Sequence, residues 1–311
     1  MGSPIGGTIQ QIAGATSSGT AGAVLFTLDD MGALSFNEQE TPGGAWQGWV
    51  GPKFATQPIV GIDIACAGQN NGNLLLAMLD EKGLVWTLSQ DASGSWTTWV
   101  GPGIGNQGLG FASIAAGQQS GARGIQLVAA DEMGDVWTCY EMNPGSNWTN
   151  WTNNMQTGAP AGVGEVALAG QNNGCLILFA EAAGLISTLP QTQGGGSWGS
   201  WSTTGMDAGT NLTNICACQQ GGTRGVQFWG LNSSGEIWSV FQDTAGGSWD
   251  PWIGPGWNGQ PEAFVNIAAT GQNNGCIIFF GVDEAGNLWA TWQLSPGGGW
   301  SPWTLFPGPP S

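Results

Sequence analysis

The sequence predicts an all-β fold: a six-bladed propeller with four antiparallel strands in each blade. Three repeated sequence motifs support this prediction: a pair of tryptophans, a polar turn that ends in glycine, and a polar hairpin rich in Gln and Asn. The composition agrees, because 56 Gly and 19 Trp among 311 residues suit short strands and tight turns better than long helices.

The tryptophan pair has the form Trp-x-x-Trp and recurs six times, with 50 to 52 residues between successive first tryptophans. Such self-similarity at a fixed period is the signature of a repeat architecture. Because the two indoles are three residues apart, strand alternation predicts that they point to opposite faces and pack between neighbouring blades. The pairs are Trp46/Trp49, Trp96/Trp99, Trp148/Trp151, Trp198/Trp201, Trp249/Trp252 and Trp300/Trp303.

A polar turn precedes each tryptophan pair and carries Gly in its fourth position, as in Asp80-Glu-Lys-Gly83 and Asp283-Glu-Ala-Gly286. A glycine there accepts a positive φ, and the side chain of the opening Asp or Asn caps the turn. This chemistry is typical of a β-hairpin, so the turn is expected to join two strands of one blade.

A second hairpin, near the start of each unit, differs between odd and even units. It reads Gly-Gln-Asn-Asn-Gly in units two, four and six, starting at Gly68, Gly170 and Gly271. In units three and five it is longer and carries Arg123 and Arg224. The ancestral module is therefore hypothesised to be a pair of units of about 101 residues, the separation of the two arginines.

Four short runs of strand length lie between these motifs in each unit, most clearly in the last one, at 264–269, 276–282, 288–294 and 300–306. Repeated antiparallel units predict a ring in which neighbours bury each other's faces. Ring closure is expected to depend on packing between units one and six, helped by residues 1–7 or 306–311. Residues 1–311 form one domain, with units at 8–52, 59–104, 111–154, 163–205, 212–257 and 264–308.

The net charge of −17 limits the partners of the chain. Nucleic acid and anionic membrane surfaces are excluded, because both attract clustered Lys and Arg. No apolar run is long enough to span a bilayer, so no membrane insertion is expected. The acidity favours solubility and a neutral or cationic ligand. Arg123 and Arg224 either bind an acidic group or pair with a nearby carboxylate; the remaining basic residues are Lys53 and Lys82.

The six cysteines are predicted to be small buried thiols, with no disulfide and no metal site. Cys66 and Cys216 share one repeat position three units apart, whereas only neighbouring units of a ring could be bridged. His is absent, and no cofactor is expected. Free thiols favour synthesis in a reducing compartment, and residues 1–7 lack the features of a signal peptide. Cellular location stays open, including release to the extracellular space.

The segment from Asp283 to Trp303 contains two of these motifs in succession, Asp-x-x-Gly-x-apolar-Trp and Gly-Gly-x-Trp-x-x-Trp. This combination resembles the PLL-like and tectonin-type β-propeller lectins, and all six units carry parts of it. The resemblance implies multivalent binding of monosaccharides, often fucose, in shallow pockets between adjacent blades, with glycans or glycoconjugates as partners. Those lectins include seven-bladed rings, whereas this chain has room for six. Whether rings pair into homo-oligomers is left open.

The candidate sugar sites are pairs on the third strand of four units, each a Trp followed four residues later by Gln or Glu. Even spacing on a strand places both side chains on one face. An indole can stack on a sugar ring, and an amide or carboxylate can bind its hydroxyls. The alternative is that the indoles wedge blades together and the polar groups bind backbone. The pairs are Trp86/Gln90, Trp137/Glu141, Trp238/Gln242 and Trp289/Gln293.

Enzymatic activity is not expected. The segment Ser89–Trp96 is loosely similar to the Asp-box of sialidases, but that family uses three Arg and a Tyr nucleophile, and this chain has two Arg and one Tyr. Without His, no Ser-His-Asp or Cys-His constellation can form. Acidic residues recur at hairpin turns, where they have a local role, instead of pairing for glycoside cleavage. The remaining alternative to a lectin is a protein-interaction scaffold without catalytic activity.

Overall fold

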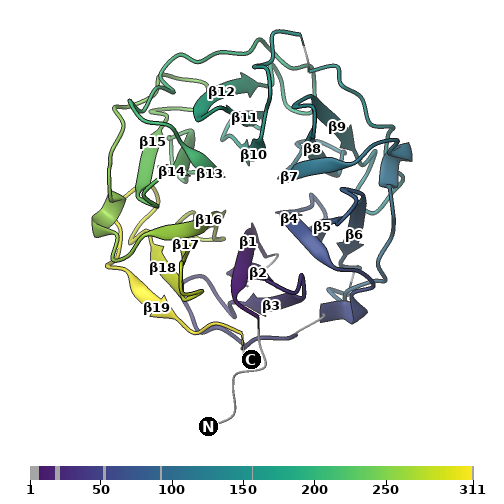
Figure 1. Ribbon diagram of the computed structural model, residues 1–311, viewed down its shortest axis with the longest axis horizontal. Helices are drawn as coiled ribbons and strands as arrows, with labels where there is room; N and C mark the ends of the chain where they lie inside the picture. The colour runs from purple at the N-terminus through teal and green to yellow at the C-terminus, as the bar shows by residue number, and fades with distance from the viewer. Residues whose placement is uncertain (1–6, 18–21, 52–53, 92, 156, 310–311) are drawn as a thin grey trace.

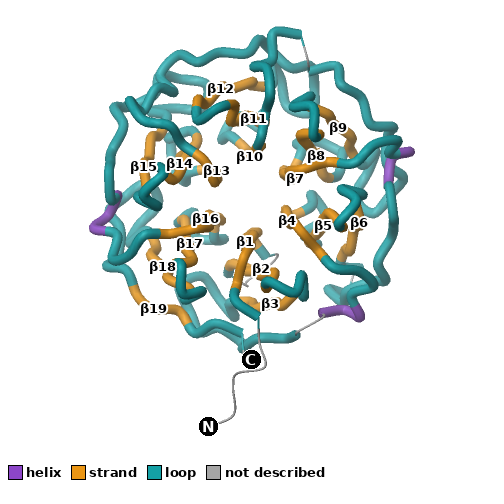
Figure 2. Tube along the Cα trace, in the orientation of Figure 1, coloured by secondary structure: helices purple, strands orange, loops and turns teal. Residues whose placement is uncertain are grey.

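The fold consists of six antiparallel sheets arranged around a central channel, as Figure 1 shows. The computed structural model describes residues 7–17, 22–51, 54–91, 93–155 and 157–309. Strands dominate, and the only helical segments in these ranges are three short 3₁₀ turns at the outer edge of the ring (Figure 2). No helix in the described ranges is long and apolar enough to cross a membrane. The 3₁₀ turns are η1 (Phe54–Thr56), η2 (Ile104–Asn106) and η3 (Trp257–Gly259).

Each sheet contains strands that follow one another in the chain, with the first strand next to the channel. The predicted repeat therefore maps one unit to one sheet. The first three sheets are β1 (Ile9–Thr16), β2 (Ala23–Asp29) and β3 (Leu34–Glu38); β4 (Gly61–Gly68), β5 (Leu74–Asp80) and β6 (Val85–Ser89); and β7 (Phe111–Gln118), β8 (Ile125–Asp131) and β9 (Val136–Tyr140). The others are β10 (Glu165–Gly170), β11 (Leu176–Ala182) and β12 (Leu185–Pro190); β13 (Thr213–Gln219), β14 (Val226–Leu231) and β15 (Ile237–Phe241); and β16 (Phe264–Gly271), β17 (Ile277–Asp283), β18 (Leu288–Trp292) and β19 (Thr304–Phe306).

The outermost segment of most units is not a regular strand, which corrects the prediction of four strands in every blade. Among the described residues, only the sixth sheet has a fourth strand, β19. In the other five, the segment with the tryptophan pair joins the third strand through isolated bridges, such as Gln90 with Trp96 and Thr87 with Val100.

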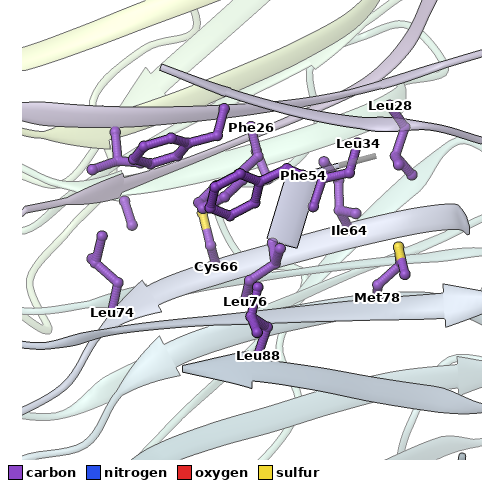
Figure 3. Packing of buried hydrophobic residues seen from close by; sticks show 14 residues of the cluster. Phe26, Leu28, Leu34, Phe54, Ile64, Cys66, Leu74, Leu76, Met78 and Leu88 are labelled. Carbon is purple, nitrogen blue, oxygen red and sulfur yellow. The ribbon is translucent and has the colours of Figure 1, made fainter. Parts of the chain in front are cut away.

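Both indoles of a pair pack into the same interface, with the sheet that precedes their own. The prediction of opposite faces was therefore wrong. Trp96 and Trp99 both pack on the cluster between the first and second sheets. The Trp96 ring stands edge-on to Phe26, at 5.7 Å between centroids, and to Phe54, at 5.5 Å. Figure 3 shows Phe26 and Phe54 within this cluster, which fills the space between the sheets.

In four of the six pairs, the second indole also donates a hydrogen bond to the preceding unit, whereas Nε1 of Trp99 and of Trp303 has no partner among the described residues. Trp151 Nε1 donates to the carbonyl of Ile104 at 2.9 Å, and Trp201 Nε1 donates to that of Met155 at 2.8 Å. Because a buried indole N–H needs a partner, these bonds fix both the depth and the direction of the ring. The equivalent donors are Trp49 Nε1, to Pro307 at 2.7 Å, and Trp252 Nε1, to Gly205 at 3.2 Å.

The turn between the second and third strands has the predicted chemistry and a further role. Asp80 Oδ1 accepts hydrogen bonds from the N–H groups of Lys82 and Leu84, both at 2.9 Å, and Gly83 has a φ of 69°. The carbonyl of Gly83 also accepts the N–H of Phe111, at the start of the next unit, at 2.9 Å. The hairpin glycine therefore links consecutive sheets as well as turning the chain.

The first and sixth sheets pack directly against each other. Trp46 lies edge-on to Phe306, with centroids 4.9 Å apart, and Trp49 donates to Pro307 as above. The N–H of Ile12 donates to Asn266 Oδ1 at 3.1 Å. The predicted contribution of residues 1–6 and 310–311 concerns positions outside the described residues.

Hydrogen bonds from the hairpins between first and second strands join the six sheets into three pairs. Asn70 Nδ2, from the second sheet, donates to three carbonyls in the long hairpin of the third sheet, including that of Arg123 at 2.8 Å. Gln69 Nε2 donates to Glu141 Oε2 across the same interface at 2.8 Å. The same arrangement joins the fourth sheet to the fifth and the sixth to the first, through Asn172, Gln171, Asn273 and Gln272. Odd and even units therefore have distinct roles, as the two forms of this hairpin indicated.

A ring of polar side chains surrounds the channel and joins neighbouring first strands. Asp63 Oδ2 accepts the N–H of Ile114 at 2.9 Å. Backbone groups at an inner sheet edge lack a neighbouring strand, so these acceptors satisfy them. The equivalent acceptors are Ser113, Glu165, Asn214 and Asn266. Burial raises the pKa of Asp63 from 3.8 to about 7, and the pKa of Glu165 is also raised, mainly by burial.

This raised pKa predicts that the fold loses stability as pH rises from about 4 to 7. Asp63 binds a proton more tightly in the folded chain than in the unfolded one, so its stabilising contribution is complete below pH 3.8 and is lost through about pH 7. The variant Asp63→Asn keeps an acceptor for Ile114, because Asn214 accepts the N–H of Ile267 in the same way three sheets further along the chain. We expect its urea midpoint to depend less on pH and to exceed that of the parent at pH 8. An unchanged pH slope in this variant would contradict the assignment.

Candidate functional site

The third-strand tryptophans predicted to bind sugar make hydrogen bonds within their own hairpins. Trp86 Nε1 donates to Asp80 Oδ2 at 3.0 Å, and Trp137 and Trp289 donate to the equivalent aspartates at 2.8 and 3.0 Å. Trp238 has no such acceptor among the described residues, because Asn232 replaces the aspartate. All four indoles are half-buried against neighbouring segments.

The polar partners of these tryptophans lie at the other end of the strand. Glu141 Oε2 accepts the N–H of Ile125 at 3.1 Å, and Gln293 Oε1 accepts that of Ile277 at 3.0 Å. Four residues of strand separate each pair by about 13 Å, so the two side chains do not converge on one recess. Gln90 and Gln242 bind the backbone in the same way. Sugar binding by these eight residues stays a prediction.

A recess of about 680 Å³ opens instead between the third and fourth sheets. Its floor is polar: Gln126 Nε2 donates to Thr138 Oγ1, which donates to the carbonyl of Leu127 at 2.9 Å. Tyr140 and Trp198 provide aromatic surface from the two sheets, and both rings are half-buried. Exposed polar side chains at the rim include Gln193, Thr152 and Asn154.

Arg123 lies at the inner end of this recess. Its guanidinium carbon is 4.5 Å from the centre of the Tyr140 ring, the geometry of a cation–π contact. The hairpin of the fourth unit packs on its stem, where a Cβ at Gly195 would be 3.7 Å from Arg123 Cδ. The chain therefore holds the arginine between an aromatic ring and a glycine.

The fifth and sixth sheets repeat this arrangement. Arg224 lies over Phe241 at 4.3 Å, and its stem contacts Gly297 of the next unit. On the floor, Gln227 Nε2 donates to Ser239 Oγ at 2.8 Å. The third and fifth units thus share an arginine, an aromatic ring and a polar floor.

Two other interfaces have different chemistry at the matching position. Between the sixth and first sheets, a recess of about 220 Å³ is lined mainly by apolar side chains, with Ile278 and Ala290 at the floor positions. Between the first and second sheets, Phe36 stacks on Phe54 with centroids 5.0 Å apart, and both belong to the core cluster there. The interfaces are therefore not equivalent.

The sequence predictions missed most residues of the recess. Gln126 and Gln227 interrupt otherwise apolar second strands, whereas the matching residue in the sixth unit is Ile278. That polar residue in a buried run was an available signal. Tyr140, the single tyrosine of the chain, was another, because it lies on the strand that contains the predicted Trp137.

Buried thiols and acidic residues form no further site among the described residues. All six cysteines are free and five are buried, as predicted, and burial raises the pKa of Cys218 to about 12. No group of three or more Cys, Asp or Glu side chains in the described ranges could hold a metal ion.

Solved structures share this fold at low sequence identity. No protein-family model matches the chain, and no curated protein does. The fungal lectin of Aleuria aurantia, described as a six-bladed β-propeller with a novel fucose recognition mode, has a TM-score of 0.63 and 17% identity over 96% of both chains. BP39L lectin from Burkholderia pseudomallei has a TM-score of 0.65 and 16% identity over 96% of this chain and 84% of its own. AofleA from Arthrobotrys oligospora has a TM-score of 0.64 and 13% identity over 98% and 88%. These likenesses establish the six-bladed propeller fold.

Proposed function

We propose that this protein is a lectin that binds single sugar units in recesses between its sheets. The recess between the third and fourth sheets carries the proposal, because it joins aromatic surface to hydrogen-bonding groups in a volume of about 680 Å³. Pockets of this size accommodate small ligands. The shared fold with lectins supports it, including one crystallised with α-methyl fucoside.

The chemistry of the recess suits carbohydrate. The faces of Tyr140 and Trp198 can stack on the C–H face of a sugar ring. Gln126, Thr138 and Gln193 offer amides and a hydroxyl that can donate to and accept from sugar hydroxyls. The lining contains no His, Asp or Glu, so it offers no acid–base pair for hydrolysis, and we propose binding without catalysis.

Recurrence of the site would give multivalency. The interface between the fifth and sixth sheets has a similar hydrogen-bonded pair, Gln227 and Ser239, and a matching arginine. Weak sites on one rigid ring gain avidity on a surface that displays many copies of a glycan. We therefore propose glycans and glycoconjugates as the partners, bound weakly by each site and strongly by the ring.

The test is a glycan array with the labelled protein, competed by free fucose, galactose and N-acetylglucosamine. The proposal expects binding to a defined glycan class that its free monosaccharide displaces. The variant Tyr140→Ala removes an aromatic wall from a half-exposed position of this recess. It is expected to weaken binding at this one recess by about tenfold, from the 0.5–1.5 kcal/mol of a ring contact and the displaced arginine. A folded protein that binds no glycan would favour the scaffold alternative.

A further inference from the structure

Arg123 is a cation that makes no ion pair with any residue that the structure describes. Within the described part of the chain, no carboxylate oxygen lies within 4.0 Å of its side-chain nitrogens, and its guanidinium makes no hydrogen bond there. Its contact is with the ring of Tyr140, and the group is half-exposed in the recess. Arg carries five N–H donors in a planar fork that matches an anionic oxygen pair.

The recess that Arg123 enters holds no opposing charge. Its lining residues include no Asp and no Glu, so Arg123 is the only ionised side chain among them. Glu141, on the same unit, is buried and accepts the N–H groups of Ile125 and Gly145 and the amide of Gln69. Its hydrogen-bonding capacity is thus directed into the protein. In a chain with a net charge of −17, this recess is a local positive site.

The matching arginine of the fifth unit is in different surroundings. Asp243 and Asp250 lie close enough for their side chains to share a hydrogen bond, and Arg224 acts on Asp250 electrostatically. The residues at the same positions of the third unit are Met142 and Thr149, 101 positions earlier. Asp250, with Asp243 beside it, therefore offsets the charge of Arg224, whereas the matching positions beside Arg123 carry no carboxylate.

We propose that the recess between the third and fourth sheets selects a sugar that carries an anionic group, a carboxylate or a sulfate, which the Arg123 guanidinium binds. This inference rests on the proposed lectin function and names the ligand class of one of its sites. A charge-assisted, bidentate hydrogen bond from an arginine supplies both affinity and orientation. At the interface between the fifth and sixth sheets, where Arg224 acts on Asp250, no preference for an anionic sugar is expected.

The test compares methyl glucuronoside with methyl glucoside by calorimetric titration, and includes glucose 6-sulfate to separate a carboxylate from a sulfate ligand. We expect the parent protein to bind at least one anionic sugar about tenfold more tightly than the neutral one at low salt, with the difference shrinking as salt rises. Arg123→Gln is expected to remove the preference. Thr149→Asp, which copies the fifth unit, is expected to remove it while the arginine remains, and Arg224→Gln is the matched control that keeps it.

The outcomes separate the two proposals. Equal binding of anionic and neutral sugars by the parent protein overturns this inference and leaves the lectin function standing. A preference that survives Arg123→Gln, or that Arg224→Gln removes, also overturns it, because the anion is then held elsewhere. Binding of no sugar in titration and on the array overturns both.

Discussion

Replacing Gly83 by alanine is expected to lower the free energy of unfolding by roughly 3 kcal/mol or more, a loss that few single substitutions reach. Gly83 has a φ of 69°, where a side chain costs about 1–2 kcal/mol. In addition, a Cβ there would lie 2.3 Å from the backbone N and O of Phe111, in the next unit. Backbone atoms cannot yield as a flexible side chain can, so the two sheets must move apart.

Gly94→Ala is the matched control for this prediction. Gly94 has a φ of 79°, but a Cβ at this position would meet no atom of the described residues within 4 Å. The expected loss of free energy of unfolding for this variant is therefore only the cost of a side chain at a positive φ, about 1–2 kcal/mol. Urea unfolding of both variants gives the comparison. Equal losses would mean that the glycine serves only its own turn and that the contact with Phe111 contributes nothing.

Replacing Trp86, Trp137, Trp238 and Trp289 together by alanine is expected to prevent the ring from folding. Truncation of a buried Trp costs about 3–5 kcal/mol. The cost for each of these tryptophans is smaller, because they are only partly buried. Four such losses still match the whole free energy of unfolding of a typical domain, about 5–15 kcal/mol. Circular dichroism and gel filtration would report the loss of the folded ring.

Replacing the same tryptophans by phenylalanine separates a role in folding from a role in sugar binding. Trp137→Phe retains an aromatic ring and loses the hydrogen bond from Nε1 to Asp131, so we expect a cost of about 1–2 kcal/mol and a folded protein. If the fourfold alanine variant folds and no longer binds sugar, the third-strand sites that the sequence predicted are correct. If the fourfold phenylalanine variant folds and still binds sugar, the recess between the sheets is the better site.

The candidate site could be predicted only in part. The sequence indicated pockets between adjacent units through its resemblance to lectins, and it marked Arg123 and Arg224 as unusual. It placed the sugar contacts on Trp86 and its equivalents, because even spacing on a strand suggests a shared face. Spacing gives the face of the strand but not the hydrogen-bond partner of each indole, which is a hairpin aspartate for Trp86, Trp137 and Trp289.

The sequence by itself determined the number of units, the hairpin turns and the free thiols. Each of these depends on residues that are close in the chain: the Asp80 carboxylate binds N–H groups two and four positions away. The regular period then requires six similar sheets, because no unit can bury both of its faces alone.

Only the tertiary structure decided where the side chains of one unit meet those of the next. Trp96 and Trp99 both turn toward the preceding sheet, since its core offers them more burial than alternation along an outer strand would. Arg123 and Arg224 occupy matching positions in the repeat, yet Arg224 acts on Asp250, whereas the third unit has Thr149 at that position. Such contacts form between residues about 50 positions apart or between opposite strands of a hairpin. A pattern of neighbouring residues therefore does not predict them, and they depend on how the sheets pack.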